Sequence, residues 1–350
     1  METKEIINLL IQKAQAALPD ITIIFLANVK SVTSNRYDYS DSSILTEFLS
    51  VEECNELLTS LQNFGFFTLI YYNSEKFIRD YYNEKFTTSK IIIFEGTQKG
   101  IGKARDSYIP AFCDLEGLLH TGPNAYINGI CTNKYHWTKL LEGHNVSVPN
   151  SWQYNMGEWL NGQRPILNKT LIAKPCYECA SIGIHKQSID RYSYKYENYL
   201  NKLSMTYNQP FIVQEFISGY EVEVPIIIHQ KKPYILPPVV ICKKDSYVMG
   251  NEILDFDDIY DDAYQFCLLN TINTSIDLQV KTEALKVVKI IDLERYTRID
   301  FRVDINGKCY VTDINSYPHI VHHSSFAYAF KQLNNNTENL LPCLIGNILP

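Results

Sequence analysis

The chain has 350 residues, of which 45% are hydrophobic and 20% charged, and its formal net charge is −7. This length suits two or three packed lobes rather than one core. The negative charge argues against a general nucleic-acid or anionic-membrane surface, although one cleft can still be basic. The N-terminal segment lacks the apolar centre of a signal peptide, and the longest apolar run, about residues 21–29, is too short to cross a bilayer. With an odd number of cysteines as well, we expect a cytoplasmic protein with reduced thiols and no nucleic-acid or membrane partner.

The first third of the chain alternates apolar runs with amphipathic segments. Strands are predicted at 21–29, 66–72 and 90–95, and a helix over 43–65 that ends at Gly65. This alternation predicts a parallel α/β lobe, in which ligands bind at the carboxyl ends of the strands. The segment after the third strand is therefore an expected functional loop, and it carries Glu95, Lys103 and Arg105.

The rest of the chain reads as short helices followed by several strands. Helices are predicted over 124–143 and 282–292, and strands at 170–175, 211–216, 221–228, 233–242, 297–305 and 309–315. An acidic stretch occupies 255–262, and the last two strands are predicted to be joined by a two-residue turn at Asn306 and Gly307.

The last two predicted strands carry alternating polar residues. Arg298 and Asp300 lie two apart on one strand, and Asp313 and Asn315 two apart on the next. Period-two spacing places each pair on one sheet face, so Asp300, Asp313 and Asn315 can converge. Carboxylate and amide oxygens suit Mg²⁺ bound together with substrate phosphates. The alternative is the polar face of an exposed hairpin.

Two further segments suggest a nucleotide site. Lys174 ends an apolar strand and can contact phosphate, and residues 179–183, including Ser181, offer backbone N–H groups and a hydroxyl. An ordinary strand-to-loop turn would explain this segment equally. Gln214, Glu215, Phe216 and Ile217 can present polar groups to a base edge, and Glu221 can bind ribose hydroxyls. A plain hairpin is the alternative there.

The order and spacing of these segments resemble the ATP-grasp superfamily, and more narrowly the D-alanine–D-alanine ligase group. Residues 120–149 (HTGPNAYINGICTNKYHWTKLLEGHNVSVP) and 315–325 (NSYPHIVHHSS) resemble two further segments of that group. The resemblance extends from about Ile91 to Ser325, roughly two thirds of the chain. It implies an α/β (α+β) ATP-grasp fold with an N-terminal parallel lobe (1–122), a small central lobe (123–209) and a C-terminal mixed-sheet lobe with the metal site (210–350).

The resemblance also implies roles for individual residues. ATP phosphates would be bound by Lys134, Lys174 and the loop around Ser181, and Mg²⁺, with Mn²⁺ as an alternative ion, by Asp300, Asp313 and Asn315. Adenine would pack on Ile172 within a pocket lined by Gln214, Glu215, Phe216 and Ile217, with Glu221 on the ribose. Arg298 would stabilise an acyl phosphate and its tetrahedral intermediate, and Ser324 would contact the acceptor's carboxylate. The partners implied are a carboxylate donor and an amine acceptor, and the family allows a homodimer.

Several positions depart from the group's pattern. Asp313 stands where the group has Glu, His319 follows Pro318 where it has Gly, Ala180 replaces a Ser, and the acidic stretch 255–262 lacks the usual lysine. The first strand is not followed by the group's Gly-Gly-x-Ser-x-Glu turn, whose Glu holds the first substrate's amine. Glu95, Lys103 and Arg105 therefore become candidates for donor binding, with a surface role as the alternative for the two basic residues.

Other motifs carry less weight. Residues 96–104 have the wrong spacing for a phosphate-binding P-loop and lack the Ser or Thr after Lys103. Cys176 and Cys179 form a lone Cys-x-x-Cys pair. His319, His322 and His323 suggest a transition metal, but Mg²⁺ explains the neighbouring carboxylates better.

We therefore expect an ADP-forming carboxylate–amine ligase whose substrates are not plain D-alanine, such as a dipeptide or amide ligase of specialised metabolism. The alternatives are a true D-alanine–D-alanine ligase and a non-catalytic ATP-binding scaffold.

Overall fold

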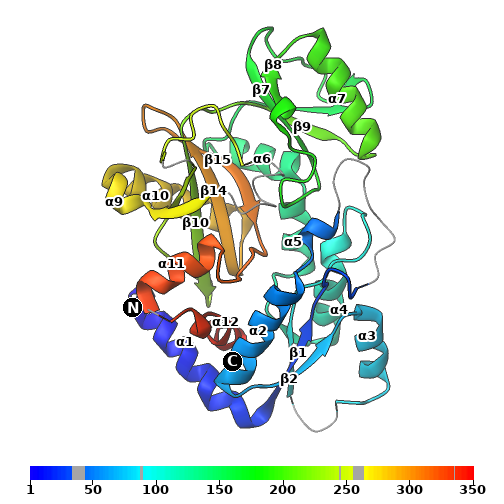
Figure 1. The fold of residues 1–350 in the computed structure, drawn as a ribbon, viewed down its shortest axis with the longest axis vertical. Coiled ribbons are helices and arrows are strands. Elements are labelled where there is room, and N and C mark those ends of the chain that lie inside the picture. Colours follow the sequence, from blue (N-terminus) through cyan, green and yellow to red (C-terminus); the bar gives the residue numbers. More distant parts are fainter. Residues whose placement is uncertain (34–43, 87–89, 244–245, 255–263, 335) are drawn as a thin grey trace.

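The computed structural model describes residues 1–350 except 34–43, 87–89, 244–245, 255–263 and 335. Within the described residues the strands form three sheets, each at the centre of one lobe (Figure 1). The acidic stretch at 255–262, which lacks the lysine usual in the D-alanine–D-alanine ligase group, lies outside the described residues. Among the helices that are described, none has the length and apolar character needed to cross a membrane.

The N-terminal lobe is a parallel sheet with the strand order β2-β1-β3-β4. All six residues of β1 are buried, as in a sheet covered on both faces. The parallel α/β lobe predicted from the alternating pattern is thus observed. Its strands are β1 (Ile21–Leu26), β2 (Phe67–Tyr71), β3 (Lys90–Phe94) and β4 (Leu119–His120), and its helical segments are α1 (Thr3–Ala17), η1 (Leu18–Asp20), η2 (Ile44–Glu47), α2 (Val51–Phe64), α3 (Ser74–Tyr82), η3 (Arg105–Ser107) and α4 (Tyr108–Glu116).

Helix α2 begins later than the sequence pattern predicted. The Ser50 hydroxyl accepts from the Glu53 N–H at 3.1 Å, and the Glu53 carboxylate accepts from the Ser50 N–H at 2.6 Å. This reciprocal capping box starts the helix at Val51 rather than near residue 43, so that part of the prediction was wrong. Its end was predicted correctly, because Gly65 adopts a left-handed conformation (φ 107°) that suits glycine.

The C-terminal helix returns to the N-terminal lobe. Helix α12 (Leu340–Ile348) packs on α1, and a Cβ atom on Gly346 would come within 1.9 Å of the Leu10 carbonyl oxygen. Leu10, Leu344 and Ile345 are buried in one apolar core with the strands of the N-terminal sheet. The two ends of the chain therefore stabilise the same lobe (Figure 1).

The central lobe is an antiparallel sheet in the order β6-β5-β9-β7-β8, covered on one face by α7 (Tyr194–Thr206). Leu171 and Ala173 of β7 pack into the core against α7, so Ile172 and Lys174 lie on the other face. The strands are β5 (Ser151–Asn155), β6 (Glu158–Trp159), β7 (Thr170–Pro175), β8 (Ile189–Arg191) and β9 (Phe211–Glu215), and the remaining helices of this region are α5 (Ala125–Thr132), α6 (Lys134–Gly143) and η4 (Lys186–Ser188).

The C-terminal lobe has the strand order β13-β12-β10-β14-β15, with β11 paired to β10. The described pairs in this sheet are all antiparallel, whereas a mixed sheet was predicted here from the sequence. One face is apolar and is covered by α10, whose Val280, Ala284 and Val287 pack against Val224 and Ile299. The elements are β10 (Tyr220–His229), β11 (Lys232–Ile235), β12 (Val239–Cys242), β13 (Gln265–Leu268), α9 (Leu269–Ile272), α10 (Thr274–Ile291), β14 (Arg295–Val303), β15 (Cys309–Asn315), α11 (Ser325–Asn334) and η5 (Thr337–Asn339).

The connection between β14 and β15 differs from the predicted two-residue turn. Asp304 N–H bonds to the Lys308 carbonyl at 3.0 Å, so the loop has three residues and Gly307 takes a positive φ of 83°. Such a loop moves the register by one residue, which would place Asp313 on the wrong face. A bulge at Thr312 restores the register, and Asp300 pairs with Asp313 after all.

Candidate active site

One face of the C-terminal sheet carries a row of charged side chains. Directly paired positions are Glu221 with Arg302 and Glu223 with Asp300 across β10 and β14, and Asp300 with Asp313 across β14 and β15. Directly opposed residues share a face, so these side chains lie together opposite the apolar core. The strand register places Asp300 and Asp313 on the same sheet face, as expected from the sequence.

Arg298 sits between two carboxylates on this face. Its Nε and Nη2 donate to the two oxygens of Asp300, each at 2.8 Å, and its Nη2 lies 3.3 Å from Glu223 Oε1. Burial raises the pKa of Glu223 to about 7 and also raises that of Asp300, although Arg298 opposes both shifts. Desolvation of these two carboxyl groups therefore outweighs the stabilisation that Arg298 gives to their charged forms.

Asp313 and Asn315 complete the row on β15. Asp313 Oδ2 lies 3.7 Å from the Lys134 ammonium, and Asn315 Oδ1 accepts from the Tyr317 N–H at 3.1 Å. Both side chains are part-buried. The structure thus gathers Asp300, Asp313 and Asn315 on one hairpin, as predicted from their spacing.

Lysines from the central region face these aspartates. Lys134 begins α6 and donates to the Glu178 carbonyl at 2.7 Å, and Lys174 ends β7 and donates to the Thr312 carbonyl at 3.4 Å. The bulge leaves Thr312 unpaired in the strand ladder. The same irregularity therefore sets the register of β15 and provides the carbonyl that Lys174 contacts. Burial lowers the pKa of Lys174 despite the attraction of Asp313, and Lys134 lowers it further. Two crowded ammonium groups favour an anionic ligand such as a polyphosphate.

The residues expected to surround adenine follow on β7 and β9. Ile172 pairs directly with Gln214, and both side chains are buried. The N–H groups of Glu215 and Phe216 donate to the carbonyls of Asn150 and Thr170, so any contact with a base uses other polar groups of this segment.

Arg302 fixes the end of the same segment. Its guanidinium stacks 5.0 Å from the Phe216 ring centroid, donates to the Ile217 carbonyl at 2.9 Å and to Glu221 Oε2 at 2.9 Å. Glu221, expected at a ribose, is therefore held in place by an ion pair.

The loop after β7 has an unusual backbone. Ala180 and Ser181 both have positive φ (48° and 54°), and the Ser181 hydroxyl donates to the Leu254 carbonyl at 3.2 Å. Cys179 N–H donates to Glu47 Oε1 at 3.1 Å, while Cys176 is buried. The loop thereby contacts both the N-terminal lobe and the residue next to the undescribed acidic stretch.

Arg105 ties the N-terminal lobe to this loop. It is fully buried, and its Nη2 lies 3.0 Å from Glu47 Oε1 and 3.2 Å from Glu178 Oε2. Lys103 is exposed, with its ammonium 5.0 Å from the Tyr177 ring centroid. Both residues reach the loop rather than an open donor pocket, which favours a structural role for Arg105 over the expected substrate contact.

Glu95 lies at the carboxyl end of β3, where the parallel sheet predicts a ligand. It is buried, its Oε2 lies 3.4 Å from His120 Nδ1, and its Oε1 has no hydrogen-bond partner among the described residues. A Cβ atom on Gly122 would come within 1.8 Å of Oε2, so a larger residue there would displace this carboxylate. A buried, half-satisfied carboxylate is suited to a ligand's ammonium group.

Ser324 and His319 follow β15. The Ser324 hydroxyl oxygen accepts from the Ala327 N–H at 3.1 Å and so caps α11. A serine hydroxyl that accepts one hydrogen bond can still donate its own proton to a carboxylate. His319 is exposed and lies near Glu53 and His323.

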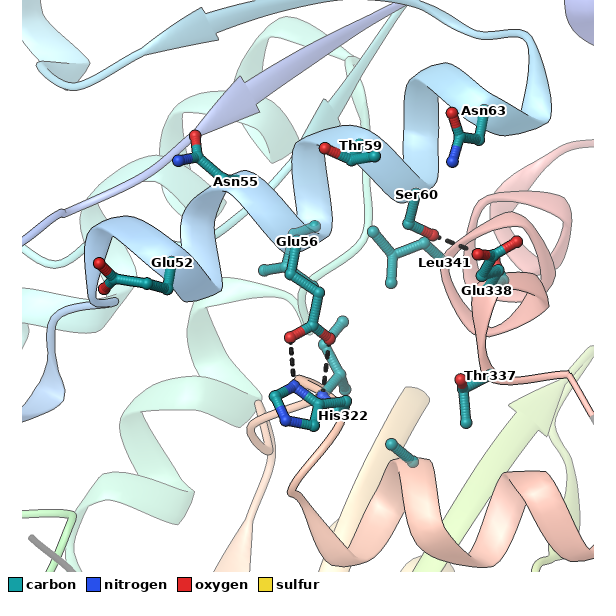
Figure 2. Close-up of a pocket in the computed structure, with 13 residues that line it drawn as sticks. Glu52, Asn55, Glu56, Thr59, Ser60, Asn63, His322, Thr337, Glu338 and Leu341 are labelled. Atoms are coloured by element: carbon teal, nitrogen blue, oxygen red, sulfur yellow. Dashed lines mark hydrogen bonds and ion pairs between the residues drawn. The ribbon is translucent and has the colours of Figure 1, made fainter. Parts of the chain in front are cut away.

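A cavity of about 460 Å³ lies beside this segment, between α2, His322 and the region of η5 and α12 (Figure 2). Glu56 accepts from both the backbone N–H and the Nδ1 of His322 there. The expected ATP-contacting residues do not line this cavity.

Sequence reasoning missed Glu223, Arg302 and Glu53. Period-two spacing could have revealed Glu223 and Arg302. Glu223 lies two residues after Glu221, and Arg302 two residues after Asp300, so each shares a sheet face with a residue already singled out. The position of Glu53 depends on contacts between segments far apart in sequence, and no local pattern reveals it.

Paired lysines above a row of carboxylates, between a small central lobe and a larger C-terminal lobe, define an ATP-grasp architecture. The family model described as D-ala D-ala ligase C-terminus matches residues 144–346, and the chain belongs to this family.

Relatives at the sequence level include the D-alanine–D-alanine ligases of Clostridium acetobutylicum, 23% identical over 61% of this chain and 62% of the relative, and of Natranaerobius thermophilus, 21% identical over 69% and 65%. The chain therefore matches less than two thirds of the length of these relatives.

Solved structures share the fold across nearly the whole chain. The D-alanine–D-alanine ligase from Bacillus anthracis complexed with ATP has a TM-score of 0.68 at 16% identity and covers 93% of this chain and 97% of its own. The VanG D-Ala:D-Ser ligase from Enterococcus faecalis has a TM-score of 0.65 at 14% identity, with 94% and 100% covered. The predicted ATP-grasp fold and family are confirmed.

Proposed function

We propose that the protein is an Mg²⁺-dependent, ADP-forming ligase that joins a carboxylate donor to an amine acceptor, both amino-acid-like. The observation that carries this proposal is the meeting of Lys134, Lys174 and Asp313 above the carboxylate row. Lys134 lies 3.7 Å from Asp313, and Lys174 donates to the carbonyl of the neighbouring Thr312. Cations for a polyphosphate thus lie next to oxygen ligands for a divalent ion.

The oxygen set fits Mg²⁺. Asp300 and Asp313 are directly opposed, and Asn315 adds an amide oxygen. Mn²⁺ would suit the same hard ligands. When bound, the ion would neutralise charge on the phosphates during transfer.

The chain's own residues would then act in a fixed order. Lys134, Lys174 and the loop around Ser181 hold the ATP phosphates in line with the donor carboxylate. A carboxylate oxygen attacks the terminal phosphorus, ADP leaves, and an acyl phosphate forms. The acceptor's amine attacks the acyl carbon, inorganic phosphate leaves with the carboxylate's oxygen, and a proton is lost from nitrogen. Arg298 stabilises the oxyanion, and Asp300 fixes the guanidinium in position.

Glu95 and Ser324 would position the substrates. The free Oε1 of Glu95 suits the donor's ammonium group, and the Ser324 hydroxyl suits the acceptor's carboxylate. Arg105 is already paired with two carboxylates of the protein, so it is not free to bind extra carboxylates of a donor. This pairing favours an ordinary amino acid as the donor over a carboxylate-rich molecule. We propose a donor other than plain D-alanine, since Glu95 replaces the turn that holds the amine in the D-alanine ligase group.

The test is a phosphate-release screen over all pairs of D- and L-amino acids, with mass spectrometry of the products. We expect phosphate release that requires two substrates and yields their amide. Activity with D-alanine alone would identify a D-alanine–D-alanine ligase, and ATP binding without release in any pair would indicate a scaffold.

A further inference from the structure

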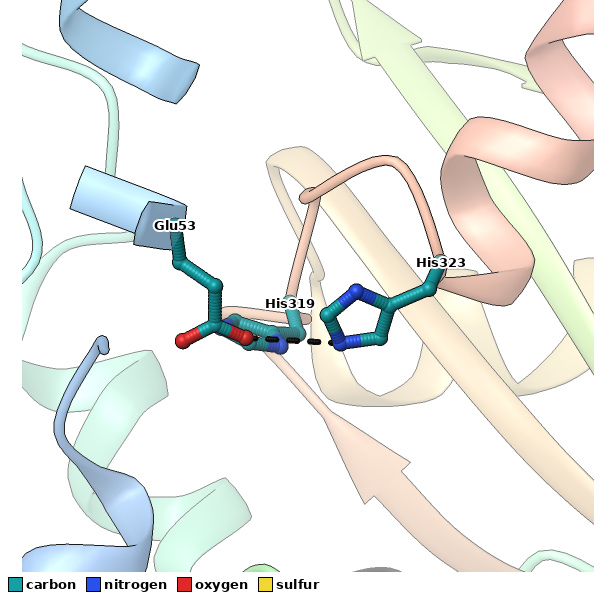
Figure 3. Close-up of side chains that lie close together, drawn as sticks. All are labelled: Glu53, His319 and His323. Carbon is teal, nitrogen blue, oxygen red and sulfur yellow. Dashed lines mark ion pairs between the residues drawn. The ribbon is translucent and has the colours of Figure 1, made fainter. Parts of the chain in front are cut away.

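Three possible metal ligands from two lobes meet outside the ATP-facing row. Glu53 extends from the first turn of α2, and His319 and His323 belong to the segment between β15 and α11 (Figure 3). One ligand atom from each residue lies within 4.8 Å of the others, and Glu53 Oε1 is 3.3 Å from His323 Nε2. We propose that Glu53, His319 and His323 bind a divalent transition-metal ion of the zinc type, at a site separate from the oxygen ligands on β14 and β15.

The donor set selects this class of ion. Two imidazole nitrogens and a carboxylate oxygen suit Zn²⁺ and its neighbours, whereas Mg²⁺ prefers oxygen ligands alone. One carboxylate and two neutral imidazoles together carry one negative charge toward a divalent cation.

The carboxylate is already held by a second contact. Glu53 Oε2 accepts from the Ser50 N–H at 2.6 Å in the capping box, which leaves Oε1 directed at His323. Hydrogen bonds of this kind orient metal ligands and raise affinity. Ligand atoms around tetrahedral zinc are separated by roughly 3.3 Å, so closing the set requires side-chain shifts of about 1.5 Å at most.

The location gives the ion a consequence for the fold. Glu53 belongs to the N-terminal lobe, whereas His319 and His323 lie between Asn315 and Ser324 in the C-terminal lobe. A bound ion would cross-link the lobes at the segment that connects the proposed Mg²⁺ ligand to the proposed acceptor contact. Three protein ligands would leave at least one position for water or a substrate atom.

The neighbouring pair of His322 and Glu56 provides a matched control. This pair also joins α2 to the segment between β15 and α11, but His322 is not one of the three proposed metal ligands (Figure 2). Removing His322 deletes an imidazole and an interlobe ion pair without deleting a proposed ligand.

The experiment uses untagged, chelator-treated full-length protein in excess Mg²⁺. We expect one equivalent of Zn²⁺ to bind in competition with a chromophoric chelator, to raise the melting temperature, and Co²⁺ to give a visible absorption band. His319→Ala, His323→Ala and Glu53→Gln should each lower Zn²⁺ affinity by about 100-fold or more, and His322→Ala should leave it unchanged. Gln at position 53 preserves the capping box, so the fold is retained.

Two results would overturn the proposal. One is the absence of Zn²⁺ and Co²⁺ binding by the wild-type protein, which would leave the cluster as an interlobe ion pair. The other is an equal loss of affinity in His322→Ala, which would place the ion elsewhere. Mg²⁺-ATP binding is measured separately on the same samples. Failure of the zinc proposal can therefore be distinguished from failure of the proposed ligase function.

Discussion

Asp300 and Asp313 lie directly opposite each other on β14 and β15 although the loop between the strands has one residue more than a tight hairpin turn. The bulge at Thr312 compensates for the extra loop residue. The Thr312 hydroxyl donates to the Asp300 carbonyl at 3.2 Å, and the Thr312 carbonyl accepts from the Lys174 ammonium. The proposed metal ligands, the strand register and the lysine proposed to bind phosphate therefore depend on the same irregularity in β15.

Asp313→Ala should reduce turnover by about 100-fold or more, because a divalent ion stabilises transferred phosphoryl charge by several kcal/mol. ATP affinity should fall much less, since the lysines remain. Steady-state kinetics and calorimetric ATP titration measure the two effects, with Glu142→Ala, an exposed carboxylate on α6, as the control. Normal turnover in the Asp313 variant would remove the hairpin from the active site.

Lys174→Ala should weaken ATP binding about ten- to a hundred-fold, because a charge-assisted contact is worth roughly 1.5–3 kcal/mol. Lys202→Ala, which removes an exposed lysine on α7, should leave ATP affinity unchanged. Calorimetry on both variants checks this. Equal affinities in the two would mean that Lys174 lies outside the phosphate site.

Ser324 has two roles that substitutions can separate. Ser324→Ala removes the helix cap, at a cost of about 1 kcal/mol, and the contact to the acceptor's carboxylate, which should raise the acceptor KM about ten-fold or more. Ser324→Asp keeps a capping oxygen but repels a carboxylate, so it should recover stability and not KM. Melting temperatures and both KM values distinguish the roles. If Ser324→Asp recovered the acceptor KM together with stability, Ser324 would be a cap alone.

Arg105→Met should destabilise the protein by about 3–5 kcal/mol, because Glu47 and Glu178 lose a buried partner. Adding Glu47→Gln should recover part of this loss, and Lys103→Met should have little effect. Denaturant unfolding gives the free energies. A variant of normal stability but raised donor KM would instead place Arg105 at the substrate.

The sequence predicted most of the elements because their signals are local. Alternation along β14 and β15 placed Asp300, Asp313 and Asn315 on one face, and the apolar strand ending in Lys174 was found with its bounds. The start of α2 was misplaced although Ser50 and Glu53 formed a readable capping box. The three-residue loop and the bulge could not be predicted from the sequence. The loop shifts the register of β15 by one residue and the bulge shifts it back, so the pairing of Asp300 with Asp313 is the same as with a two-residue turn.

The remaining differences concern contacts between distant segments. Lys103 and Arg105 were expected either near a donor or at the surface, and the structure encloses Arg105 between carboxylates from η2 and the loop after β7. The meeting of Glu53 with His319 and His323 likewise joins residues more than 260 positions apart. Such contacts depend on how the lobes pack, which periodicity and spacing do not encode.

The central claim is that the donor's carboxylate is activated by phosphorylation, and oxygen transfer tests it directly. With the substrate pair found in the screen, the donor is labelled with ¹⁸O in its carboxylate and the released phosphate is analysed by mass spectrometry. The proposed route predicts one ¹⁸O atom in each phosphate formed and one left in the amide carbonyl. Phosphate without ¹⁸O, released at the same rate as the amide, would contradict it.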